Sequence, residues 1–89
     1  MEEVLEWFTK NYKQTKTECI EILLQAQKDY PFTIEQIQEG CVELRKANFI
    51  DKDYLPTHIK LLGELCNVGI KASIAGEKLR EAILKSEQS

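Results

Sequence analysis

The sequence has few residues that interrupt regular structure, with only four glycines and two prolines among 89 positions. This scarcity disfavours a β fold, in which turns rich in glycine and proline recur at short intervals, and it favours long regular elements. No segment alternates apolar and polar residues with enrichment in β-branched side chains, so we assign no strands. The sequence therefore predicts a helical protein.

Long apolar runs and an excess of positive charge are lacking as well. No stretch approaches the roughly 20 apolar residues that cross a bilayer, and the acidic start Met1–Glu6 lacks the basic region of a signal peptide. The net charge of −3 gives no overall basic field for holding nucleic acid or anionic lipid. We therefore expect a cytoplasmic protein with no membrane partner.

Cysteine and histidine are too few and too scattered to form a recognisable chemical site. Cys19, Cys41 and Cys66 are odd in number, which disfavours a disulfide framework. No two of them have the short spacing of a zinc half-site, so we interpret them as reduced thiols that fill the core. His58, the only histidine, falls in the first turn of an expected helix, and we interpret it as a partly exposed surface side chain.

Motifs of catalysis and cofactor binding are also missing. The chain has no glycine-rich phosphate loop, no G-x-S-x-G elbow and no H-E-x-x-H helix. Asp51-Lys52-Asp53 resembles the start of a calcium loop, but the glycine and the terminal glutamate of such a loop do not follow. We therefore expect a non-enzymatic protein with no catalytic residue, no cofactor and no metal.

Helix boundaries, by contrast, are well marked. Pro31 and Pro56 each close one segment and precede an apolar run, and a threonine after each proline is suited to cap the next helix. Thr15 and Thr33 each stand three residues before a glutamate or glutamine, which is capping-box spacing. The residues expected to cap or close helices are Thr15, Thr33, Thr57, Gly69 and Ser73.

These boundaries predict a single all-α domain over 1–89, a compact bundle of four to five amphipathic helices with no β-sheet. The expected helices cover about 2–13, 15–29, 33–48, 57–68 and 73–86. One continuous helix from Glu2 to Lys28 remains an alternative, because no residue between them forbids it.

Apolar spacing predicts how the helices face the core. The 15–29 helix carries apolar residues on more than one side, so we expect it to be central. Gly40 interrupts a helical pattern at a cost of about 1 kcal/mol relative to alanine, which a close helix crossing would explain. The expected fourth helix has one side made of His58, Leu61, Leu62, Leu65 and Val68. The expected fifth helix has Ala75, Leu79, Ala82 and Ile83 facing inward.

The functional prediction is a protein–protein interaction module, such as a regulator, adaptor or inhibitor, with a net acidic helical surface. Trp7 lies off the apolar face of the first helix, and exposed aromatic side chains often anchor interfaces. Glu35, Glu39 and Glu43 recur every fourth residue, so they share one helix face that suits a basic partner. The identity of the partner protein and the oligomeric state stay open.

A nucleic-acid-associated regulator of the helix-turn-helix kind is the alternative. Lys10, Lys13 and Lys16 recur every third residue and could contact phosphates. Phe32–Asp53 also resembles the second and third helices of a winged-helix domain, which implies nucleic-acid binding. The resemblance rests on Thr33–Gln36 as a cap, Val42 and Leu44 as core and Phe49-Ile50-Asp51 as the exit. It ends there, because Pro56–Val68 has a helical pattern where a winged helix needs a β-hairpin.

Overall fold

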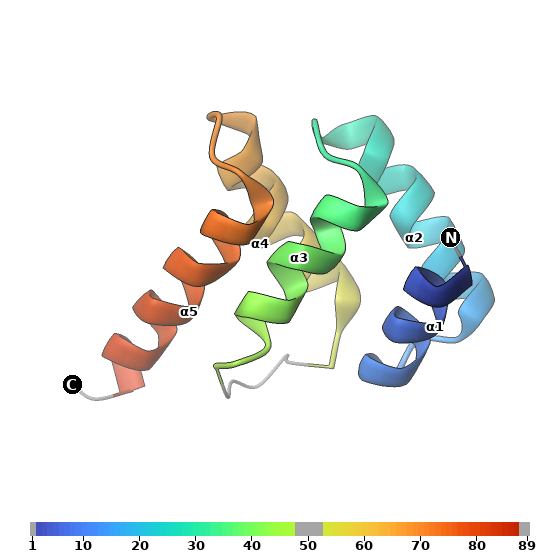
Figure 1. The fold of residues 1–89 in the computed structure, drawn as a ribbon, viewed down its shortest axis with the longest axis horizontal. Helices are drawn as coiled ribbons and strands as arrows, with labels where there is room; N and C mark the ends of the chain where they lie inside the picture. The colour runs from blue at the N-terminus through green and yellow to red at the C-terminus, as the bar shows by residue number, and fades with distance from the viewer. Residues whose placement is uncertain (1, 48–52, 88–89) are drawn as a thin grey trace.

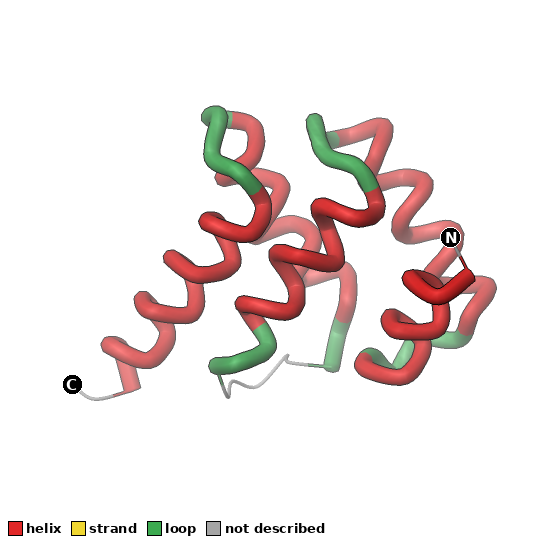
Figure 2. Tube along the Cα trace, in the orientation of Figure 1, coloured by secondary structure: helices red, strands yellow, loops and turns green. Residues whose placement is uncertain are grey.

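The computed structural model describes residues 2–47 and 53–87, and these residues form five α-helices (Figure 1). The helices are α1 (Glu2–Asn11), α2 (Lys16–Asp29), α3 (Ile34–Leu44), α4 (Leu55–Asn67) and α5 (Ala72–Glu87). No strand occurs in the described residues, as Figure 2 shows. The predicted all-α bundle is therefore confirmed, and each expected helix has an observed counterpart.

The helices form two layers. α1, α3 and α5 lie side by side in the layer nearest the viewer in Figure 1, and α2 and α4 lie behind them. α3 lies between α1 and α5 in the near layer and also packs on α4, which makes it the central helix. The expectation that the 15–29 helix is central is wrong, because α2 packs on α1 and α4 at one edge and leaves Leu24 53% exposed.

Capping explains why α1 and α2 are two separate helices. The Thr15 hydroxyl accepts a hydrogen bond from the Glu18 N–H at 3.2 Å, and the Glu18 carboxylate accepts one from the Thr15 N–H at 2.9 Å. This capping box holds Thr15 in an extended conformation, so the alternative of one helix over Glu2–Lys28 is wrong. Thr33 and Gln36 form a second capping box at the start of α3.

The predicted caps of α4 and α5 are wrong. α4 begins at Leu55, so Pro56 occupies the first turn, where its missing N–H costs no hydrogen bond, and Thr57 lies inside the helix. The side chain of Gln14, from the α1–α2 turn, accepts the Leu55 N–H at 3.0 Å. α5 begins at Ala72, which places Ser73 inside its first turn. The left-handed Gly69, with φ of 90°, is confirmed.

Leu62, Leu65, Ala75, Leu79 and Ile83 face the core as predicted, whereas Val68 and Ala82 do not. Val68 is 73% exposed because it forms the C-cap of α4, where the chain turns away at Gly69. Ala82 is exposed, whereas Leu79 and Ile83 are half-buried against the core. The residues of these two helices that are buried are Leu55, His58, Ile59, Leu62, Gly63, Cys66, Ala72, Ala75 and Gly76.

Gly40 and Gly76 bring α3 and α5 into backbone contact. A Cβ atom at Gly40 would lie 2.8 Å from the carbonyl oxygen of Ala72, and one at Gly76 would overlap the carbonyl of Gly40. No side chain fits between the two helices at this point, so the close crossing expected from Gly40 is confirmed. No helix among the described residues is long and apolar enough to cross a membrane.

Replacing Gly76 with alanine is expected to destabilise the protein by about 3 kcal/mol or more, because the added methyl group would overlap the Gly40 carbonyl. At an exposed helix position the same change stabilises by about 1 kcal/mol, so the sign of the effect reports the crossing. Urea unfolding of G76A measures it.

The matched control is G69A. A Cβ at Gly69 meets nothing within 4 Å, so its expected cost of about 1 kcal/mol comes from the left-handed backbone alone. Equal losses of stability in G69A and G76A would contradict the close crossing.

Candidate functional site

A polar cluster lies in the core where α1, α3 and α4 meet. Tyr12, which directly follows α1, shares a hydrogen bond of 2.6 Å between its hydroxyl and Nδ1 of His58. The thiol of Cys41 on α3 lies close enough to this hydroxyl for each group to influence the pKa of the other. The guanidinium carbon of Arg45 lies 4.8 Å from the centre of the Tyr12 ring. The cluster thus joins groups that are far apart in the sequence.

Burial controls the protonation of this cluster. It raises the pKa of the Cys41 thiol to about 12, with smaller opposing effects from the hydrogen bond to Tyr12 and the charge of Arg45. It also raises the pKa of the Tyr12 hydroxyl above its usual range. Both groups therefore keep their protons at neutral pH, and a protonated thiol is a poor nucleophile.

The interpretation of His58 as a surface side chain is wrong, because the ring has no exposed area. The Tyr12 hydroxyl provides a hydrogen bond inside the core, which reduces the cost of burying the imidazole. Tyr12 and Cys41 are buried too, so the cluster is closed to a substrate in this conformation. Its geometry ties together the end of α1, α3 and α4.

All three cysteines are free and buried, as the core interpretation predicts. Burial raises the pKa of the thiols of Cys19 and Cys66 as it does for Cys41. Across residues 2–47 and 53–87, no group of three or more histidine, cysteine, aspartate or glutamate side chains is placed to hold a metal ion.

A groove with acidic walls lies between α3 and α5, two helices of the near layer. Its walls include Glu39 and Glu43 from α3 and Glu77 from α5, and Val42 and Ser73 lie between them. The groove has a volume of about 450 Å³. Val42 is 38% exposed, so an apolar side chain remains available among the three carboxylates. We call this feature the acidic groove.

Ion pairs restrain one end of the acidic groove. Glu43 accepts hydrogen bonds from Lys46 at 2.9 Å and from Arg80 at 2.6 Å, which hold the pKa of its carboxyl below the usual range. Arg80 also lies 3.9 Å from Glu77. Glu39 makes no ion pair with a described residue, so its charge is the one most available to a partner.

The other predicted site residues lie elsewhere. Glu35 is exposed near the start of α3, outside the residues that line the acidic groove. Trp7 is half-buried, with its ring edge-on to Phe8 at 5.0 Å between centres, and packs against the core. Both remain predicted contact residues, but the structure does not bring them together with the groove.

The three lysines surround the turn between α1 and α2. Lys10, Lys13 and Lys16 are all exposed, and the Lys13 ammonium lies 5.6 Å from the centre of the Tyr54 ring. They come from the end of one helix, the turn and the start of the next, so they do not share one helix face.

The structure differs from a winged-helix domain in its core and at the position of the wing. Val42, expected in the core, is partly exposed, and Pro56–Val68 is helix α4 with its C-cap. The expected exit, Phe49-Ile50-Asp51, lies outside the described residues.

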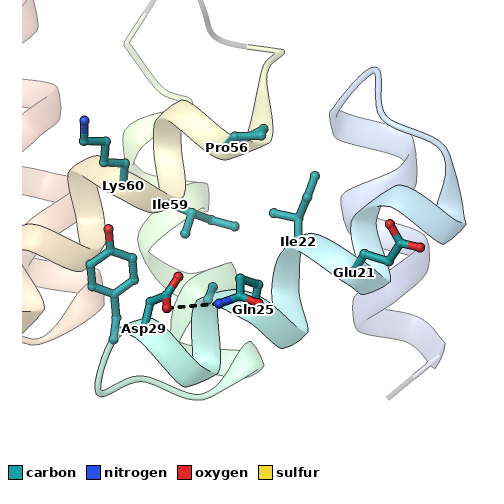
Figure 3. Close-up of a pocket in the computed structure, with 9 residues that line it drawn as sticks. Glu21, Ile22, Gln25, Asp29, Pro56, Ile59 and Lys60 are labelled. Atoms are coloured by element: carbon teal, nitrogen blue, oxygen red, sulfur yellow. Dashed lines mark hydrogen bonds between the residues drawn. The ribbon is translucent and has the colours of Figure 1, made fainter.

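A second groove lies between α2 and α4, on the far layer. Figure 3 shows the side chains of Ile22 and Ile59 in the space between the two helices. Glu21 and Asp29 line it from α2, and Lys60 lines it from α4. Gln25 donates a hydrogen bond of 3.1 Å to the Asp29 carboxylate, which restrains that acid along the α2 wall (Figure 3). We call this feature the α2–α4 groove.

Sequence reasoning missed Glu77, Ser73 and Arg80, because they join α3 only through the packing of α5. The Glu43–Arg80 pair spans 37 positions, and no local spacing indicates it. Gly76 was the available signal, since a second glycine in a helical pattern suggests where a partner helix approaches.

No protein-family model, curated protein or solved structure matches this chain.

Raising the pH from about 9 to about 12 is expected to destabilise the fold. The unfolded chain loses the Cys41 proton near the ordinary thiol pKa of 9.0, whereas the folded chain keeps it until about 12. Stability is therefore full below pH 9 and is lost as the pH rises through this window. In C41A, the slope of unfolding free energy against pH should be shallower by up to about 1.4 kcal/mol per pH unit.

Urea unfolding under reducing conditions at several pH values measures these slopes. The comparison uses slopes because C41A also leaves a small cavity that lowers stability at every pH. The two proteins should have matching slopes between about pH 6 and 8, where the thiol is protonated in both states. Identical slopes above pH 9 would contradict the burial of an un-ionised Cys41.

Proposed function

We propose that this chain is a small cytoplasmic, non-enzymatic protein–protein interaction module, of the regulator, adaptor or inhibitor kind. The observation that supports it most is the convergence of Glu39, Glu43 and Glu77 around Val42. A groove of this size with acidic walls and an accessible apolar side chain suits a segment of another protein.

The charge of the groove specifies the kind of partner. Glu43 is already paired with Arg80 and Lys46, so a bound segment would meet Glu39 and Glu77 first. A lysine or arginine of the partner would pair with these two carboxylates, while an adjacent apolar side chain would contact Val42. Opposite charges of this kind also speed association, which suits a regulator that binds and releases its target.

Apolar surface in the groove supports the same partner. Val42 lines the groove and is 38% exposed. An amphipathic basic segment would cover this apolar side chain and the acidic groups at once.

Binding of a helix-forming peptide made of leucine and lysine tests the acidic groove. We expect E39K to weaken binding by about five- to tenfold, because it reverses the most available charge of the groove. E64K is the matched control, since Glu64 is also an exposed helical glutamate but lies on α4. It changes the net charge equally and should leave affinity within about twofold.

Isothermal titration calorimetry of the unmodified protein, E39K and E64K measures these affinities at low and moderate salt. Equal weakening in E39K and E64K would show that the peptide responds to net charge alone. That result would contradict a groove-specific interaction.

The same titration with duplex and single-stranded DNA tests the alternative function at Lys10, Lys13 and Lys16. The interaction module is expected to bind neither DNA at low salt, because its net charge is −3. Salt-sensitive DNA binding that is lost in K10E/K13E/K16E would instead support the nucleic-acid-associated regulator.

A further inference from the structure

Arg80 of α5 places a positive charge at one end of the acidic groove. Its Nη1 atom donates a hydrogen bond of 2.6 Å to Oε1 of Glu43, and its Nη2 atom lies 3.9 Å from Oε1 of Glu77. Glu43 lines the groove from α3 and Glu77 lines it from α5, so one guanidinium contacts both walls. The acidic groove therefore carries a cation of its own before any partner binds.

The structure holds this cation firmly. The side chains of Arg80 and Glu43 are only 20% and 25% exposed, so most of the pair is withdrawn from water. Separating a largely buried pair leaves each charge poorly compensated, which costs much more than an exposed ion pair contributes. We therefore expect a partner to bind beside Arg80 rather than to displace it.

Glu39 leaves a second cation position open in the same groove. It lies one helical turn, about 6 Å, before Glu43 on α3, and it makes no ion pair with a described residue. The side chain of Glu77 is 52% exposed, so it can contact a partner as well as Arg80. The groove thus offers one position for a partner's cation, with the fixed charge of Arg80 about one turn further along.

We propose that Arg80 is a specificity-determining residue, which makes the acidic groove select amphipathic segments with a single lysine or arginine beside an apolar side chain. This inference rests on the proposed function and adds which basic segments the groove accepts. The single cation pairs with Glu39 and Glu77, and the apolar side chain contacts Val42. A second cation one turn away meets the Arg80 guanidinium, and that repulsion offsets its attraction to Glu43.

Three helix-forming peptides of alanine, leucine and glutamine, blocked at both ends, test this selectivity. The first carries one lysine beside a leucine. The other two carry a second lysine one helical turn before or after the first, because either chain direction could bring it to Arg80. Isothermal titration calorimetry at moderate salt should give affinities of the unmodified protein for all three peptides that agree within about twofold.

R80Q removes the cation and should bind one of the two dibasic peptides about three- to fivefold more tightly than the single-lysine peptide, because the second lysine gains an exposed ion pair. Lys46 still pairs with Glu43 in this variant, so that carboxylate keeps a partner. R80K keeps a cation in the groove and should discriminate as the unmodified protein does. Circular dichroism of each variant confirms that the fold is kept.

K78Q is the matched control for R80Q. Lys78 is also on α5, is exposed and makes no ion pair with a described residue. Its loss changes the net charge equally, so K78Q should show the same relative affinities for the three peptides as the unmodified protein.

A dibasic peptide that binds the unmodified protein about fivefold or more tightly than the single-lysine peptide would overturn the proposal without any variant. Unchanged relative affinities in R80Q, or equal changes in R80Q and K78Q, would overturn it too. Binding of the single-lysine peptide that E39K weakens, without discrimination by Arg80, would leave the proposed function intact. No binding of that peptide would overturn both proposals.

Discussion

The backbone contact between α3 and α5 is the constraint on which the rest of the structure depends. At Gly40 and Gly76 the two helices approach so closely that neither position has room for a Cβ atom. Burial of α3 against α5 makes α3 the central helix of the near layer. The same crossing places Arg80 beside Glu43 and makes the walls of the acidic groove. Without it, three carboxylates of two distant segments would not share one surface.

The contacts that join the two layers differ from the backbone contact that joins α3 and α5 within the near layer. The hydrogen bond between Tyr12 and His58 links the end of α1 to α4, and the thiol of Cys41 on α3 lies close to the same hydroxyl. A buried polar network of this kind specifies one arrangement of helices, because any shift would leave its groups unpaired. The Gln14 cap on α4 adds a second link from the α1–α2 turn. The rigid layers then present one groove on each side.

Local signals in the sequence predicted local structure well. The capping boxes at Thr15 and Thr33, the left-handed Gly69 and the buried cysteines were all correct, because each depends on neighbours within a few residues or on residue type. His58 was misplaced because its partner, Tyr12, is 46 positions away. Helical spacing places Glu39 and Glu43 on one face of α3, whereas Glu77 joins them only through the packing of α5, which no local pattern indicates.

The most direct test of the α3–α5 contact is a nuclear Overhauser measurement on the protein in solution. A Cβ at Gly76 would lie 3.0 Å from Cβ of Glu43, and one at Gly40 would lie 3.0 Å from the methyl carbons of Leu62. One of the two Hα atoms of each glycine points in the direction of this Cβ. Strong cross-peaks are therefore expected from Gly76 Hα to Glu43 Hβ and from Gly40 Hα to the Leu62 methyl groups. A folded protein that lacks the Gly76–Glu43 cross-peak would contradict the crossing and the groove that depends on it.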